Sequence, residues 1–196
     1  PPPPPPRPTP HTSSAASDEY KRQVWDALLY RDPATNEYLP NLATSYNWVD
    51  SKTLEFDLRK GVTFHNGEKF DADDVVYTLT YISNPENGAK PARNVNWWDS
   101  AEKLGDYKVR LNLTKEFPAA LEFLSGPIVM YPNEYYAEVG PEGMAMKPVG
   151  TGPYAVTSVE PGKRYKFKKN DNYHASSPKG QANIGNIVIR TIAESN

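Results

Sequence analysis

The sequence predicts an α/β fold of the mixed α+β kind, and three observations support this class. Apolar and polar residues alternate over 53–58 and 107–113, which is typical of half-buried strands. Residues 71–82 place apolar side chains at helical spacing behind an acidic start. Residues 187–189 form an uninterrupted apolar run, which is typical of a buried and often parallel strand.

Four helices are expected. The first covers residues 17–29, with a serine cap and two acidic residues in its first turn, and 31–33 ends it. The second begins after Asp71, the expected N-cap, and ends at Asn84-Pro85. Two short helices are expected over 118–124 and 132–139.

The remaining strands are short, and turn residues separate them. Residues 62–64 are expected to form a short strand, and Asn66-Gly67 favours a tight turn directly after it. Residues 84–103, which include Trp97 and Trp98, are expected to form a loop. Two further strands are expected over 154–159 and 165–168, joined by a turn at 160–163.

Composition excludes several classes of protein. The 196 residues suffice for one or two domains with a sizeable core. The formal net charge of -2 argues against a chain that mainly coats nucleic acid or an anionic membrane. The absence of cysteine excludes disulfides, iron–sulfur clusters, cysteine-ligated zinc and thiol catalysis. The sequence contains no apolar run long enough to cross a bilayer and does not begin with a signal peptide.

No catalytic or metal-binding constellation is evident. His11, His65 and His174 lack the spacing of metal ligands. The acidic run 71–74 lacks the glycine and distal glutamate of a calcium loop, so helix capping explains it. We therefore expect no catalytic residue, no metal and no cofactor, and a binding or structural role.

Two glycines in the segment 148–154 are expected to be structural. Gly150 and Gly152 precede a strand, where a Cβ would clash with a neighbouring chain segment or the backbone would need a positive φ. The segment is too short for a phosphate loop, and no lysine follows in the required place.

Basic residues cluster over 163–169 and alternate with Tyr165 and Phe167. Such a cluster could contact an anionic partner. A strand with one solvated basic face produces the same pattern and is the favoured interpretation.

Several segments resemble one family in the correct order. They are LEFDLRKGVTFHNGE at 54–68, DADDVVY at 71–77, PVGTGPY at 148–154, NDNY at 170–173, and shorter matches at 9–11, 25–29 and 39–43. Together they are similar to the family 5 extracellular solute-binding proteins, the dipeptide, oligopeptide and nickel receptors of ABC importers. The departure lies at the start, where Pro1–Pro6 occupy the place of an aliphatic strand in that family.

The resemblance implies a periplasmic-binding-protein-like fold of two lobes that close on a ligand. It assigns 1–16 to a proline-rich tail and lobe entry, 17–31 and 148–196 to the core of the first lobe, and 32–147 to an inserted β-rich subdomain. The second lobe would be absent. The ligand would be a peptide or similar small solute, and the partner an ABC permease at the membrane.

The same resemblance names candidate ligand-binding residues. The segment after His11 would line the cleft, namely Ser13, Ser14, Ala15 and Ala16. Trp97 and Trp98 are further candidates, and packing inside the subdomain is the alternative role for both. A periplasmic or other extracytoplasmic location is implied, with or without a lipid anchor. We expect no nucleic-acid partner, and self-association of a lone first lobe is a further expectation.

Two other classes of function stay open. A proline-rich segment such as 1–10 favours polyproline II, so the chain could be a scaffold whose tail binds a partner. An enzyme is the third class, which no nucleophile–base pair or metal set supports.

Overall fold

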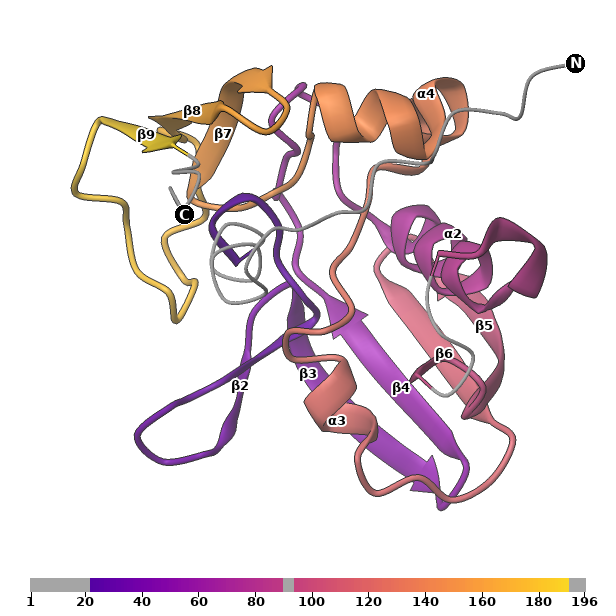
Figure 1. Ribbon diagram of the computed structural model, residues 1–196. Coiled ribbons are helices and arrows are strands. Elements are labelled where there is room, and N and C mark those ends of the chain that lie inside the picture. Colours follow the sequence, from indigo (N-terminus) through magenta and orange to yellow (C-terminus); the bar gives the residue numbers. More distant parts are fainter. Residues whose placement is uncertain (1–21, 90–93, 191–196) are drawn as a thin grey trace, which may run out of the picture.

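A computed structural model describes residues 22–89 and 94–190 (Figure 1). The strands are β1 (Leu29–Arg31), β2 (Tyr38–Pro40), β3 (Ala43–Asp50), β4 (Thr53–Leu58), β5 (Trp98–Gly105), β6 (Lys108–Leu113), β7 (Tyr154–Glu160), β8 (Arg164–Lys169) and β9 (Asn186–Arg190). The helices are α2 (Ala72–Ser83), α3 (Ala120–Phe123), α4 (Asn133–Met146) and the 3-10 helix η1 (Pro85–Asn87). The described part of the chain is therefore mixed α and β, as the sequence predicts.

The largest sheet is antiparallel and has the strand order β3-β4-β6-β5. Every second residue of β4 and β6 is buried, which places Leu54 and Phe56 opposite Leu111 and Val109 on one face. Helix α2 covers that face (Figure 1). The alternation over 53–58 and 107–113 therefore predicts both strands correctly.

The opposite face of this sheet is polar. Arg110 donates to Glu55 Oε1 through Nη2 at 2.6 Å and through Nε at 3.0 Å, directly across the β4–β6 pair. Lys108 lies 3.1 Å from the other oxygen of Glu55. Such exposed pairs contribute little to stability, and they keep this face soluble.

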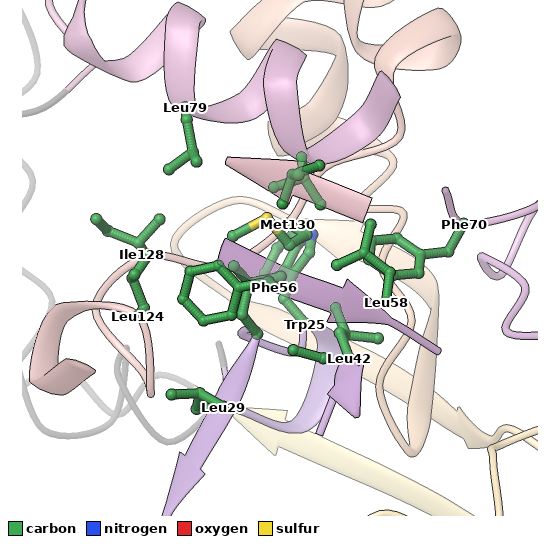
Figure 2. Close-up of a cluster of buried hydrophobic side chains, with 14 of the residues drawn as sticks. Trp25, Leu29, Leu42, Phe56, Leu58, Phe70, Leu79, Leu124, Ile128 and Met130 are labelled. Carbon is green, nitrogen blue, oxygen red and sulfur yellow. The ribbon is translucent and has the colours of Figure 1, made fainter. Parts of the chain in front are cut away.

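Buried apolar side chains form one cluster that joins the separate elements. Figure 2 shows residues of β1, β4, α2 and the segment after α3 meeting in it. Leu29, Phe56, Leu79 and Leu124 are each at most 1% exposed. Burial of one such side chain contributes about 1.5–3 kcal/mol, so this cluster is the main source of stability.

Helix α2 begins as the sequence predicts. Asp71 Oδ1 accepts the N–H of Asp73 at 2.8 Å, and Asp74 Oδ2 accepts the N–H of Asp71 at 2.9 Å, which completes a capping box. Asp74 Oδ1 also accepts the N–H of Asn133, the first residue of α4, at 2.9 Å. One buried carboxylate therefore caps two helices, since the N-cap of α4 is Pro132 and makes no side-chain cap.

The prediction of a helix over 17–29 is wrong for residues 25–29. Residues 22–24 are helical, but the chain then leaves the helix and forms β1 at Leu29–Arg31. The reason is tertiary: the carbonyls of Asp26 and Leu28 accept from Met130 and Ala43, which competes with helical hydrogen bonding. The first residues of the predicted helix lie outside the described part.

Two predictions in the middle of the chain, one of a loop and one of a strand, need correction. The loop expected over 84–103 ends at Trp98, where the edge strand β5 begins. Only Trp98 of its residues is buried, and polar and apolar residues do not alternate along it, so the sequence gives no strand pattern there. The strand expected over 62–64 is a single bridge between Thr63 and Lys69, because the turn at 65–67 follows at once.

The third sheet has the order β7-β8-β9 and is antiparallel throughout. The strand expected over 187–189 exists, but it pairs antiparallel to β8 and is exposed rather than buried. No described element covers it. The short helices are found as predicted at α3 and α4, although α4 continues past Val139 through a break at Gly140, where φ is +64°.

We expect Asp71→Ala to lower the free energy of unfolding by about 0.5–2 kcal/mol, because it removes the cap of α2. Urea denaturation measures this, with Asp99→Ala, an exposed residue of β5, as the control. Calcium or zinc should leave the melting temperature of both proteins unchanged. A metal-dependent rise that Asp71→Ala abolishes would contradict the capping role.

Candidate functional site

A fully buried carboxylate organises the junction between the sheets. Asp26 is 0% exposed, and its two oxygens accept hydrogen bonds from several distant segments. Oδ1 lies 2.7 Å from Lys179 Nζ and 3.2 Å from the Tyr173 hydroxyl, and Oδ2 accepts from the Thr151 hydroxyl at 3.0 Å. Asn41 Nδ2 donates to Oδ1 at 3.3 Å.

Lys179 is the counter-ion of this carboxylate. Burial by itself would raise the pKa of Asp26, but the Lys179 ammonium outweighs it, so the pKa lies below its ordinary value. The same ammonium donates to the carbonyls of Arg22 and Trp25 at 2.6 and 3.0 Å. Asp26 is therefore charged, and Lys179 ties residues 22–26 to the C-terminal part of the chain.

The glycine-rich segment 150–152 packs directly on residues 23–25. Gly152 donates its N–H to the Val24 carbonyl at 2.9 Å. A Cβ at Gly150 would overlap the Val24 carbonyl, and one at Gly152 would lie 2.5 Å from the Gln23 oxygen. Neither glycine has a positive φ, so the first of the two predicted reasons applies: the close approach of another chain segment.

We call the contact between residues 150–152 and residues 23–25 the seam. His65 forms hydrogen bonds with both glycines of the seam. Its Nδ1 accepts the N–H of Gly150 at 3.3 Å, so its Nε2 carries the proton and donates to the Gly152 carbonyl at 2.9 Å. Burial lowers the pKa of His65, although the Gly152 carbonyl and Asp26 act in the opposite direction. The ring is therefore neutral, since protonation of Nδ1 would remove one of the two hydrogen bonds.

Two adjoining hollows open beside this network. The first has a volume of about 440 Å³, and its lining includes Trp25, Tyr30, Arg31, Asn41, Glu122 and Lys179. The second has a volume of about 460 Å³, and its lining includes Arg22, Tyr30, Tyr154, Lys179, Gln181 and Ile184. Tyr30 and Lys179 line both, and Arg31 forms an ion pair of 2.9 Å with Glu122 in the first.

The lining of these hollows combines an aromatic side chain, charged groups and other hydrogen-bonding groups. Lys179 and Asn41 both line a hollow and bind Asp26, so the buried network holds them in place. A small polar organic molecule needs such a surface: apolar contact with a few fixed polar groups. We take the two hollows as the candidate site.

Of the sequence-predicted ligand-binding residues, only Trp97 and Trp98 belong to the described part of the chain, and neither lines the two hollows. Ser13, Ser14, Ala15 and Ala16 lie outside the described residues. Trp97 and Trp98 are 1% and 4% exposed, and the Trp97 ring stacks on Phe117 at 4.8 Å. This burial favours the alternative role, which is packing of the subdomain.

Asp26, Asn41, Thr151 and Tyr173 each stand in a segment that carries the family resemblance, but nothing in those segments showed that the four residues meet. Asp26 stands alone in the apolar stretch Trp25-Asp26-Ala27-Leu28, and an acid so placed indicates either exposure or a buried partner. Its partners lie up to 153 positions away, so no local pattern could identify them.

The described residues contain no cluster of three or more potential metal ligands, and none of their helices is long and apolar enough to span a membrane. Comparison with known proteins identifies the family. Residues 37–196 match the group described as "Bacterial extracellular solute-binding proteins, family 5 Middle". The chain belongs to the family 5 extracellular solute-binding proteins.

Individual relatives agree with this assignment. Di/tripeptide-binding protein 1 of Pseudomonas aeruginosa is 29% identical over 186 residues, which cover 83% of this chain and 35% of that protein. NikZ from Campylobacter jejuni, solved in complex with Ni(L-His), is 29% identical with a TM-score of 0.75, and the match covers 87% of this chain and 34% of NikZ.

A third relative is the periplasmic binding protein DppA from Helicobacter pylori, solved in complex with the peptide STSA. It is 26% identical with a TM-score of 0.78, and the match covers 92% of this chain and 39% of DppA. This family 5 chain thus spans about a third of the length of these relatives, and its structural neighbours have the two-lobe fold of periplasmic binding proteins.

We expect Gly152→Ala to lower the free energy of unfolding by about 1–3 kcal/mol or more, because the new methyl group must displace backbone of residues 23 and 24. Gly105→Ala is the control, since a Cβ there meets no atom within 4 Å. Urea denaturation measures both. Equal effects of the two substitutions would show that the seam is not close-packed.

We expect His65 to make stability fall in mild acid. Its folded-state pKa lies below the unfolded value of 6.5, so the folded protein binds fewer protons there. The contribution of His65 is therefore complete above about pH 6.5 and is lost as the pH falls toward the folded-state pKa.

The measurement compares the wild type with His65→Gln in urea at about pH 7.5 and about pH 5. The difference between them cancels other titrations, including that of Asp74, whose pKa burial raises to about 7. The advantage of the wild type should shrink at the lower pH. A constant difference would show that His65 does not titrate in this range.

Proposed function

We propose that this chain forms part of the substrate-binding component of an ABC importer, which captures a peptide or similar small solute. The observation that carries the proposal is the family match over residues 37–196, together with relatives named as peptide-binding proteins. Non-enzymatic capture is consistent with the candidate site, where the buried Asp26 is engaged by four neighbours and has no contact with solvent.

In this proposal the two hollows are one wall of the ligand cleft. Tyr30, between them, offers an aromatic surface, and Arg31, Glu122 and Lys179 offer charged groups at its margins. A two-lobe receptor gains affinity by closing a second wall over the solute and removing most of its surface from water. Ser13–Ala16 remain proposed contributors to the same wall.

The division of the chain follows from the same proposal. Residues 17–31 and 148–196 would belong to the core of the first lobe, and 32–147 would be its inserted subdomain. Support comes from the seam between 150–152 and 23–25, which joins the two proposed core segments. The partner would be an ABC permease, and the location extracytoplasmic, in keeping with the family's description as extracellular.

We expect the 196-residue chain to bind di- and oligopeptides no more tightly than about millimolar, or roughly -4 kcal/mol. One wall leaves the polar groups of the ligand half solvated, and each hydrogen bond that competes with water contributes only about 0.5–1.5 kcal/mol. Titration calorimetry with a peptide library measures this. A micromolar dissociation constant would mean that this chain carries a complete site.

Weak binding can be located by nuclear magnetic resonance. Peptide titration should shift amide signals of residues 22–31 and 179–184, and Tyr30→Ala should reduce these shifts. Val49→Ala, an exposed residue of β3, is the matched control and should not change them. Shifts confined to other surfaces, or equal shifts in both variants, would remove the hollows from the proposed cleft.

A further inference from the structure

Two buried side chains of α2 hold the segment that leads into α4. Asp74 and Thr78 stand one helical turn apart and are 2% and 0% exposed. Thr78 Oγ1 accepts the N–H of Tyr131 at 3.1 Å, and Asp74 Oδ1 accepts the N–H of Asn133 at 2.9 Å. These two bonds fix the start of α4 against α2, beside which it lies (Figure 1).

Backbone donors occupy both oxygens of the Asp74 carboxyl group. Oδ2 accepts the N–H of Asp71 at 2.9 Å, and Oδ1 accepts that of Asn133. An ionised carboxyl group has only acceptor oxygens, so it satisfies both donors. Protonation turns one oxygen into an O–H donor, and one of the two N–H groups then loses its partner.

The bond to Asn133 is the one that can open. Asp71 and Asp74 belong to one capping box, and Asp71 Oδ1 also accepts the N–H of Asp73 at 2.8 Å, so the first turn of α2 holds this backbone in place. Asn133 lies on another helix and is only partly buried, so its N–H can bond to water instead. Pro132, the N-cap of α4, makes no side-chain cap of its own.

The surroundings of Asp74 favour its protonated form. Burial raises its pKa to about 7, and the carboxylates of Asp71 and Glu68 act in the same direction, while the N–H groups of Asn133 and Asp71 oppose them. The neighbouring Asp73 is paired with Lys103 at 2.8 Å, whereas Asp74 forms no ion pair within residues 22–89 and 94–190. Its charge therefore changes near neutral pH.

The titratable groups of the other packed elements do not supply a counter-ion. Lys103 of β5 lies between Asp73 and Asp106, and Lys108 and Arg110 of β6 bind Glu55 on the opposite face of the sheet. The titratable groups at the start of α4 are Tyr131, Glu134 and Tyr135. Burial raises the pKa of both tyrosines, so they stay neutral while Asp74 titrates.

We propose that Asp74 is a pH-dependent cap of helix α4: its ionised form holds Asn133 against α2, and its protonated form releases Asn133. Thr78 and the Tyr131 backbone do not titrate, so their bond remains and the release is confined to the first turn of α4. The other end of α4 reaches the seam, since Met144 Sδ accepts the N–H of Val149 at 3.3 Å. The pH thus acts on the helix that leads into the seam.

Nuclear magnetic resonance of the 196-residue chain tests this between about pH 5.5 and about pH 8.5. The carboxyl carbon of Asp74 reports its titration, and the protection of the Asn133 amide from hydrogen exchange reports the bond. Both should change with one midpoint near pH 7, and the protection should fall severalfold on the acidic side. Protection that is the same at every pH, or two different midpoints, would overturn the proposal.

Three variants assign the effect to one side chain. Asp74→Asn does not titrate, so the midpoint at Asn133 should disappear. Asp99→Asn, at an exposed position of β5, is the matched control and should keep it. His65→Gln should keep it as well. A midpoint that survives in Asp74→Asn, or that His65→Gln removes, would contradict the role of Asp74.

Urea denaturation gives a second readout. The folded-state pKa of Asp74 lies above the unfolded value of 3.8, so the folded protein binds more protons between the two values. The wild type should therefore lose stability relative to Asp74→Asn as the pH rises through about 7. An unchanged difference between the two proteins would refute the proposal. If Asp74→Asn does not fold, the two midpoints of the wild type decide the question.

Discussion

The arrangement of this protein depends on the ion pair between Asp26 and Lys179. An isolated charge cannot be buried without a large cost in solvation free energy, so a carboxylate with no exposed surface requires several partners. Asp26 finds four partners on three separate segments: Asn41, Thr151, and the pair Tyr173 and Lys179 on the connection between β8 and β9. Each segment is thereby fixed relative to residues 22–31, which line the candidate cleft.

The packing around this charge makes the network possible. Gly150 and Gly152 allow one segment to lie against the backbone of Val24, which brings Thr151 to the carboxylate. His65 holds the same segment from the opposite side by bonding to both glycines. Hydrogen bonds and close packing within the chain therefore hold the polar groups of the candidate site in place.

Local patterns predict the parts of this fold whose residues interact with near neighbours. The alternation of β4 and β6 and the acidic cap of α2 are set by adjacent residues, and the structure agrees with both. Residues 25–29 have helical spacing but lie outside any helix, because the carbonyls of residues 26–28 accept hydrogen bonds from distant segments. β5 is an edge strand with few buried residues, so it lacks the alternation that would reveal it.

The candidate site shows the same limit more strongly. The contact of Asp26 with its partners is recognisable only in three dimensions, since Asn41 lies 15 positions away and Tyr173 lies 147 positions away, although both stand in segments that carry the family resemblance. The resemblance to a family identifies the class of protein from motifs such as 54–68 and 148–154. The first of these motifs holds strand β4 and the turn with His65, and neither lines a hollow. In the second motif, residues 150–152 pack on residues 23–25, and Pro153 and Tyr154 line the second hollow.

The distance along the chain between Asp26 and Lys179 also governs how the protein can be made. A ribosome delivers Asp26 long before Lys179, and until then a compact form would bury a carboxylate without its counter-ion. The early segments therefore gain little from collapsing while synthesis continues. Contacts of such large sequence separation also close slowly, because the intervening loop must be ordered first. The ion pair of Asp26 can therefore form only after residue 179 has been synthesised.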